Sequence, residues 1–190
     1  MTFDLADRSD GELTAMALAG RQVAYGELVR RHREHLYRLI RAHIGHSDEA
    51  LDVTQATFIA AFDALKRYDP ARPFPAWLSR IAINKCRDWR RRRVVRKFFT
   101  FASPLTEAVN LADAAPLPDQ VAGTAEELQR VMAAIAALPA SLKEPLILRA
   151  IEEKSELETA EILGISPKAV ETRLYRARQR LAGQLRMPEG

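Results

Sequence analysis

The chain has 190 residues, of which 47% are hydrophobic and 28% are charged, and its formal net charge is +4. This length suits one large domain or two small ones. No apolar run approaches the roughly 20 residues that span a bilayer, and the N-terminal segment carries acids at positions where a secretory signal is apolar. We therefore expect a cytoplasmic protein without direct membrane insertion. The single cysteine, Cys86, cannot form an internal disulfide.

The positive charge is concentrated in two segments of the chain. Residues 86–97 carry seven basic side chains and one acid, and residues 166–186 carry six basic side chains and one acid. The rest of the chain is therefore acidic. Two basic patches on an otherwise acidic chain are typical of a protein that binds a polyanion through two separate surfaces. For one such run alone, a solvated helix face would be an equally good explanation.

Helical spacing of the apolar residues predicts four helices before the middle of the chain, at about 9–19, 22–44, 47–66 and 75–93. Ser9 and Glu12 have the form of a capping box at the first start. Gly45 is placed to end the second helix, and Ser47 is the expected cap of the third. The third helix is expected to carry one apolar stripe, formed by Leu51, Phe58, Phe62 and Leu65.

Residues 94–124 interrupt this pattern, because three prolines lie among small and polar residues. Further capping boxes are expected at Thr124/Glu127, Ser141/Glu144 and Ser155/Glu158, each opening a helix. A short helix at 156–163, a turn at 164–166 and a basic helix from Pro167 to about Leu185 then follow. A helix, a short turn with glycine and a second helix form the outline of a helix-turn-helix, whose second helix enters the major groove.

We therefore expect an all-α protein with two small helical domains, residues 1–93 and 125–190, the second of which is a helix-turn-helix domain. A flexible linker, residues 94–124, joins them. This linker averages about 30 Å end to end as a free coil but can stretch to roughly 100 Å. Two turns of DNA span about 70 Å. The free chain should thus be compact, and a larger partner should hold the linker extended on DNA.

Two blocks of the sequence resemble a known family. The string DVTQATFIAAFDALKRYDPARPFPAWLSRIAINKCRDWRRRR ends at Arg93, and LPASLKEPLILRAIEE, AEILGIS and KAVETRLYRARQRL follow in the C-terminal half. Both blocks resemble the extracytoplasmic-function sigma factors of bacterial RNA polymerase, in their regions two and four. The resemblance implies promoter recognition and opening together with core RNA polymerase, with promoter DNA and an anti-sigma factor as further partners. It implies no catalytic residue, no cofactor and no small-molecule substrate.

The first block implies a polymerase-binding surface. In the family, the helix that holds Asp52 and Gln55 docks on a coiled coil of the polymerase largest subunit. Both residues point away from the stripe of Phe58 and Phe62, and Ile59 is the third expected contact. At Ala56 many relatives carry a glutamate, so one polar contact is expected to be missing.

The same block implies a surface for the minus-ten element. In the family, the loop from Tyr68 to Phe74 and the helix after it trap a base that is flipped out of the melted strand, and aromatic faces favour such an unstacked base. Tyr68, Phe74 and Asn84 are the candidates for this contact, while Trp77 and Trp89 are expected in the core. The expected phosphate contacts are Arg80, Lys85, Arg87, Arg90 and Arg91.

The second block implies a reader of the minus-thirty-five element, because arginines near the start of a recognition helix can reach base edges. The candidates on that helix are Lys168, Glu171, Thr172, Arg173, Tyr175, Arg176 and Arg178. Glu171 stands where relatives commonly have lysine or arginine, so we expect the sequence of the minus-thirty-five element to be unusual. The segment 152–159 lacks the family's glycine and aromatic residue and places Thr159 at an aliphatic core position, which predicts loose packing.

Other readings of the sequence have less support. The four histidines lie between His32 and His46, but His32 and His43 would be about 16 Å apart on a helix. No single metal ion joins two side chains at that distance. Two alternatives stay open: a helix-turn-helix regulator that acts without polymerase, and a sigma mimic that only sequesters an anti-sigma factor. A mimic, however, needs no basic helices for phosphate.

Overall fold

The computed structural model describes residues 5–101 and 122–185, and the described part of the chain is all-α, without a strand. The elements in chain order are α1 (Asp10–Leu18), α2 (Gln22–Ile44), α3 (Ser47–Asp63), the 3-10 helix η1 (Leu65–Arg67), α4 (Phe74–Phe101), α5 (Ala122–Ala137), α6 (Ala140–Ala150), α7 (Glu156–Leu163) and α8 (Pro167–Leu185). None of the described helices combines the length and the apolar character that a bilayer crossing requires. The expected fold class is confirmed.

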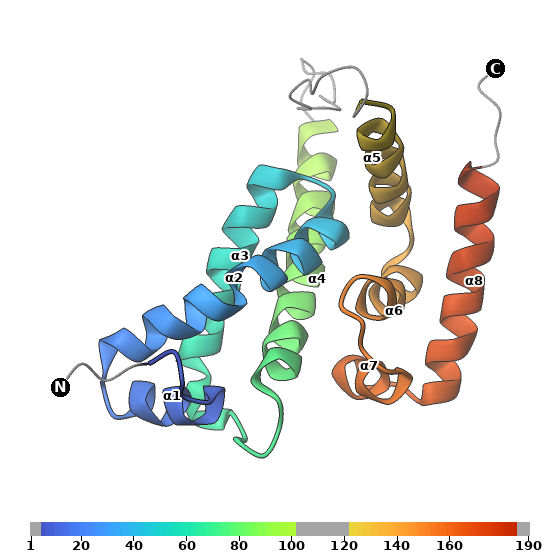
Figure 1. The fold of residues 1–190 in the computed structure, drawn as a ribbon. Coiled ribbons are helices and arrows are strands. Elements are labelled where there is room, and N and C mark those ends of the chain that lie inside the picture. Colours follow the sequence, from blue (N-terminus) through green and yellow to red (C-terminus); the bar gives the residue numbers. More distant parts are fainter. Residues whose placement is uncertain (1–4, 102–121, 186–190) are drawn as a thin grey trace.

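Helices α1 to α4 form the N-terminal domain, in which α2 packs against α1, α3 and α4 (Figure 1). The apolar residues of α2 recur at helical spacing and are buried, among them Leu28, Leu36 and Leu39. Helix α3 contributes Phe58, and α4 contributes Leu78. Because α2 contacts all three other helices, its apolar stripe organises this core.

Helices α5 to α8 form the C-terminal domain, in which α6 packs on both α7 and α8. Its core includes Leu148, Val170 and Leu174. Helix α7 ends at Gly164, whose φ of 67° lies in the left-handed region that glycine adopts without strain. The chain can therefore turn at once into α8, and the predicted helix-turn-helix is present.

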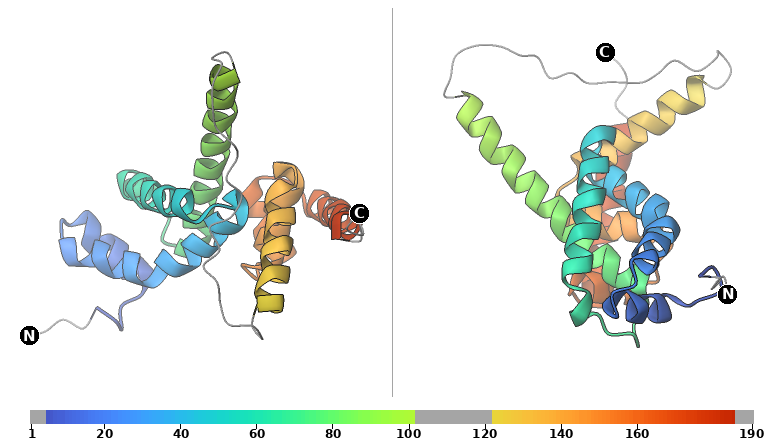
Figure 2. Two further views of the ribbon diagram at one scale, coloured as in Figure 1. Left: turned by 90° about the horizontal axis from the view of Figure 1, so that it is seen from above. Right: turned by 90° about the vertical axis from the view of Figure 1, so that its left-hand side faces the viewer.

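The two domains lie against each other, with α2 beside α5 and α6, and α4 beside α7 (Figure 1). This contact agrees with the compact form expected from the length of the linker. The right-hand view of Figure 2 shows the C-terminal end of α4 and the N-terminal end of α5 diverging from it. Most of the expected linker lies outside the described residues, but α4 continues to Phe101, beyond the predicted end at Arg93, and α5 begins at Ala122.

The capping signals had mixed outcomes. Both capping boxes at Ser9/Glu12 and Ser155/Glu158 are present, and Gly45 ends α2 with a φ of 85°. The predicted cap at Ser47 is wrong, because His46 takes the cap position and the side chain of neither residue caps the helix. The box at Ser141/Glu144 is also wrong. Helix α6 starts after Pro139, and the Glu144 carboxylate binds Arg87 of the other domain instead.

The third predicted helix differs from α3 in two respects. It ends at Asp63 and passes into η1, so its last turn is tighter than expected. Leu51, predicted in the core stripe, is 57% exposed, whereas Phe58 and Leu65 of the same stripe are buried. Trp77 and Trp89, also predicted in the core, are partly buried and pack against it. An apolar pattern alone does not say which face a neighbouring helix covers.

The atypical segment 152–159, which runs into the first turn of α7, carries an energetic cost in two places. Glu153 has a φ of 51°, a left-handed conformation that costs a residue other than glycine roughly 1 to 2 kcal/mol. Thr159 is fully buried, and its hydroxyl has no hydrogen-bond partner among the described residues. A buried hydroxyl without a partner keeps its desolvation cost. The departure from the family pattern is therefore visible as local strain.

We predict that Thr159→Val raises the free energy of unfolding by about 1 to 3 kcal/mol, because a methyl group replaces the unpaired hydroxyl at nearly constant shape. Urea denaturation followed by circular dichroism measures this. The matched control is Thr57→Val, since Thr57 is equally buried but donates to the Val53 carbonyl at 2.7 Å. A loss of stability in Thr159→Val would show that the site is not frustrated.

Candidate functional site

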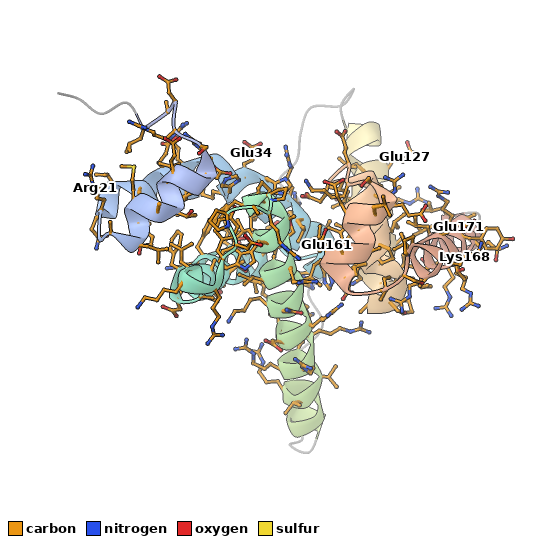
Figure 3. The ribbon with its side chains drawn as sticks, turned by 90° about the horizontal axis from the view of Figure 1, so that it is seen from below. Arg21, Glu34, Glu127, Glu161, Lys168 and Glu171 are labelled. Atoms are coloured by element: carbon orange, nitrogen blue, oxygen red, sulfur yellow. The ribbon has the colours of Figure 1, made fainter. Side chains whose placement is uncertain are left out.

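A groove of about 720 Å³ runs between α2 and α3 on the outer face of the N-terminal domain. Its apolar lining includes Tyr37, Leu51 and Phe62, and its polar lining includes Arg33 and Glu34. Figure 3 places Glu34 on the outward side of α2. Leu51 and Ile59 are more than half exposed. An apolar, concave and accessible surface of this kind suits a helical protein partner.

The expected polymerase contacts lie at this groove. Gln55 and Ile59 line it, and Asp52 is exposed on the same helix. The spacing of three and four residues puts all three on one face of α3. Tyr37 and Leu51 were not predicted there. For Leu51 a signal was present, because Leu51, Gln55, Ile59 and Phe62 also follow helical spacing on α3. For Tyr37, on α2, no pattern indicated this position.

The loop before α4 is closed over an aromatic cluster. The ring of Tyr68 lies 5.3 Å from that of Phe74 and 5.1 Å from that of Trp77, and the Tyr68 hydroxyl donates to the Arg72 carbonyl at 2.6 Å. Phe74 is only 1% exposed and packs against His32 as well. Tyr68 and Trp77 are partly accessible, so Phe74 supports their rings from below.

Helix α4 gathers four of the predicted minus-ten residues on one face. Arg80, Asn84, Arg87 and Arg91 follow at intervals of four, three and four residues, so they form one stripe. Arg87 donates to Asn84 Oδ1 at 3.3 Å. Of the other two predicted phosphate contacts, Arg90 lies on one flank of this stripe, whereas the partly buried Lys85 lies toward the far side of the helix. The structure thus brings only part of the predicted set together.

Two arginines of this stripe bind the C-terminal domain. Arg87 donates to both carboxylate oxygens of Glu144, at 2.8 and 2.5 Å. Arg80 donates to the carbonyls of Ile162 and Glu161, at 3.2 and 2.5 Å. No sequence pattern indicated these contacts, because the partners are separated by more than fifty residues.

The contact between the domains contains buried ionisable groups. The Glu144 side chain is 2% exposed. Burial by itself raises the pKa of Glu144, but the hydrogen bond from Arg87 and the nearby His43 bring it below its usual value. The His43 side chain is 3% exposed, with Nε2 3.7 Å from Glu144 Oε1, and burial lowers the pKa of His43. The folded chain therefore keeps this imidazole neutral near pH 7.

Helix α8 presents a polar face opposite its buried residues. Val170, Leu174 and Ala177 are buried, and the face turned away from them carries Lys168, Thr172, Tyr175 and Gln179. Gln179 donates to the Tyr175 hydroxyl at 2.7 Å and was not predicted as a contact, although it follows the same spacing. Arg173 and Arg176 flank this face on one side, and Glu171 and Arg178 flank it on the other.

The start of α8 carries an ion pair. Lys168 Nζ lies 2.7 Å from Glu171 Oε2, and this hydrogen bond raises the pKa of Lys168. Figure 3 shows both residues at the edge of the molecule remote from the N-terminal domain. The predicted minus-thirty-five residues are therefore accessible while the domains are in contact.

The histidines do not gather around one point. His32 Nε2 lies 2.9 Å from Asp10 Oδ2, and His35 Nε2 lies 2.5 Å from Glu152 Oε2. Among residues 5–101 and 122–185, no group of three or more His, Cys, Asp or Glu side chains is arranged to hold a metal ion. The Cys86 thiol is fully buried, and burial raises its pKa to about 12.

Comparison with known proteins defines the class. Residues 28–95 match the sigma-70 region 2 model, and residues 128–181 match the sigma-70 region 4 model. The chain is 41% identical to the RNA polymerase sigma factor CnrH of Cupriavidus metallidurans over 180 residues, which cover 93% of this chain and 94% of CnrH. It is 31% identical to the ECF RNA polymerase sigma factor SigW of Bacillus subtilis over 172 residues, covering 88% and 91% of the two chains.

Solved structures agree with these matches. The structure of CnrH in complex with the cytosolic domain of CnrY superposes with a TM-score of 0.67 at 37% identity, covering 93% of this chain and 96% of CnrH. The chain therefore belongs to the sigma-70 family, with its region 2 in the N-terminal domain and its region 4 in the C-terminal domain. Within that family it is an extracytoplasmic-function sigma factor, which directs RNA polymerase in promoter recognition and is not an enzyme.

We predict that acidification destabilises the folded chain. Burial holds the pKa of His43 and of His32 below the ordinary value of 6.5. As the pH falls through 6.5, the unfolded chain binds protons that the folded chain does not bind, so the free energy of unfolding decreases.

Urea midpoints at pH 7.5 and pH 5.5 measure this dependence. The urea midpoint of His43→Gln should fall less between pH 7.5 and pH 5.5 than that of the wild type, because one of the two buried histidines is gone. The remaining dependence comes from His32 and from carboxylates whose pKa the fold lowers, such as Glu144. An equal fall of the urea midpoint in both proteins would contradict a contribution of His43 to the pH dependence.

Proposed function

We propose that this sigma factor uses three separate surfaces: the α2–α3 groove for core polymerase, the Tyr68 loop with the α4 stripe for the melted minus-ten strand, and the outward face of α8 for the minus-thirty-five element. The carrying observation is that the three surfaces are chemically different and do not overlap. An apolar groove suits a protein partner. An aromatic cluster beside a basic stripe suits single-stranded DNA, and a polar recognition helix suits duplex DNA. We place this activity in the cytoplasm.

The groove suits the coiled coil of the polymerase largest subunit. A helical partner needs apolar contacts at helical spacing with polar residues at the edge. Ile59 supplies an apolar contact, and Asp52 and Gln55 supply the polar residues. The solved complex of CnrH with the cytosolic domain of CnrY supports a protein partner as well. We propose that an anti-sigma factor binds this sigma factor.

Asp52→Ala/Gln55→Ala is expected to reduce run-off transcription with core polymerase by at least tenfold, because both polar contacts at the groove are lost. The matched control is Asp7→Ala/Gln22→Ala, which removes the same side chains from exposed positions of α2 and of the segment before α1. Pull-down of core polymerase should show the same order of loss. Transcription at the wild-type level would contradict the polymerase assignment, and duplex binding unaffected by polymerase would favour an independent regulator.

Base capture is the role we propose for the aromatic cluster. Tyr68 and Trp77 offer partly accessible ring faces. Asn84 is an exposed hydrogen-bonding group on the α4 stripe, about two helical turns beyond Trp77. Phosphates of the same strand then meet Arg80, Arg87 and Arg91. Arg90 extends the basic surface along one flank of the helix, whereas Lys85 lies toward its far side and would meet only a strand that wraps around α4.

We expect Tyr68→Ala to weaken binding of the holoenzyme to single-stranded minus-ten DNA by about 1 to 3 kcal/mol, the usual contribution of one stacked base. Fluorescence anisotropy with an oligonucleotide from a promoter that is active in run-off transcription measures it. Tyr68→Phe is the matched control, since it keeps the ring and loses only the hydrogen bond to Arg72. Equal affinities of Tyr68→Ala and the wild type would exclude stacking on this ring.

The outward face of α8 is proposed to read the minus-thirty-five element. Lys168, Thr172 and Tyr175 would approach base edges, with Arg173, Arg176 and Arg178 on phosphates or guanines. Glu171 holds Lys168 in place and repels phosphate, and a carboxylate accepts a hydrogen bond from the amino group of cytosine. We therefore propose that Glu171 favours cytosine in the element.

A further inference from the structure

The aromatic cluster before α4 is built on the buried ring of Phe74. This ring lies 5.3 Å from the ring of Tyr68 and 5.5 Å from that of Trp77, and the two neighbours lie 5.1 Å from each other. A third ring, the imidazole of His32 on α2, lies 5.2 Å from Phe74 with 46° between the two planes. The cluster is therefore supported by α2 as well as by its own loop.

The imidazole of His32 is fixed by a carboxylate of α1. Its Nε2 atom lies 2.9 Å from Asp10 Oδ2. An ionised carboxylate only accepts hydrogen bonds, so Nε2 carries the proton and donates it. Burial lowers the pKa of His32 although the charge of Asp10 opposes this shift, and the imidazole is therefore neutral near pH 7. The hydrogen bond sets the tautomer and the orientation of the ring that packs on Phe74.

Asp10 is held in turn by Arg31. The guanidinium of Arg31 lies 3.3 Å from Asp10 Oδ1. The same group closes the turn before α1, because it donates at 2.6 to 2.8 Å to three carbonyls there, those of Leu5, Ala6 and Arg8. The carboxylate is therefore fixed from two sides, and its bond to His32 does not depend on a freely moving side chain.

Helix α1 also touches the loop that carries Tyr68. It lies against η1, and a Cβ atom built on Gly11 would be 4.0 Å from the Cβ of Pro70, an ordinary van der Waals distance. Burial, with the nearby charges of Asp10 and Asp69, raises the pKa of Tyr68, so the Asp10 carboxylate is close to this phenol as well. Figure 1 and the right-hand view of Figure 2 show α1 and the loop at the same end of the domain.

We propose that Asp10 and His32 are positioning residues for base capture: their hydrogen-bonded pair holds Phe74, and with it the accessible rings of the cluster, in the geometry that receives an unstacked base. This inference rests on the proposed role of Tyr68. A preorganised ring binds more tightly, since it is not ordered at the expense of the binding free energy. Helix α1 precedes the segment 28–95 that matches the region 2 model, so the proposal gives this helix a part in binding the melted strand.

The test measures binding of the single-stranded minus-ten oligonucleotide to holoenzyme that contains the full-length chain. His32→Leu removes the imidazole, and Asp10→Ala removes its hydrogen-bond acceptor. Asp10→Asn is the conservative variant, because its amide oxygen still accepts a hydrogen bond. The control Ile40→Val trims the buried face of the same helix at about two turns from His32. Circular dichroism checks that each variant is folded at the assay temperature.

We expect His32→Leu and Asp10→Ala each to weaken oligonucleotide binding about fivefold, because a supporting aromatic contact contributes less than the stacked base itself. Asp10→Asn and Ile40→Val should bind like the wild type. Wild-type affinity of His32→Leu would overturn the positioning role. An equal loss of affinity in Asp10→Asn and Asp10→Ala would also overturn it, since the hydrogen bond to His32 would then be irrelevant.

A double-mutant cycle with Tyr68→Ala separates positioning from general damage to the fold. In the Tyr68→Ala background, His32→Leu should cause little further loss, because the ring that it positions is gone. An equal loss in both backgrounds would show that His32 acts only on the stability of the domain and would overturn the proposal. Wild-type affinity of Tyr68→Ala alone would instead contradict base capture by Tyr68, on which the proposal rests.

Discussion

The buried pair of Arg87 and Glu144 joins the contact between the two domains to the proposed minus-ten surface. A carboxylate that is almost completely buried requires a strong partner, since its desolvation is costly without one. Arg87 is the partner that lies within hydrogen-bonding distance of both its oxygens. The same guanidinium belongs to the stripe that we assign to the melted strand. Arg87 therefore belongs both to the contact between the domains and to the surface that we propose for DNA.

Charge is distributed so that each region of the protein can serve two partners. Region 2 carries arginines on the face of α4 that region 4 covers, and region 4 carries its own cations on the far side, along α8 (Figure 3). The acids of region 4, Glu144 and Glu161, lie at the contact between them. The net charge of +4 conceals this arrangement, because acids and bases are separated by face as well as by segment.

Departures from the family pattern have identifiable physical effects. Glu153 adopts a left-handed conformation that glycine would adopt freely, and Thr159 buries a hydroxyl without a partner. Glu152, from the same segment, contacts His35 of region 2 at 2.5 Å. The segment thus packs less favourably inside region 4, and it contacts region 2 through Glu152. Glu171 departs in a different way, since it lies on the exposed recognition helix. It changes the charge of the proposed DNA surface and does not affect the packing of the core.

Local sequence determined the helices, the caps at Ser9 and Ser155, the turn at Gly164 and the outward face of α8, because periodicity and capping act over a few residues. It also placed Gln55 and Ile59 on one face. Tertiary structure alone decided that Leu51 stays exposed and outside the core, that Phe74 is buried under Tyr68, and that Glu144 binds Arg87 instead of capping α6. Those outcomes depend on which surfaces meet after folding, and a pattern within one helix carries no information about its neighbour.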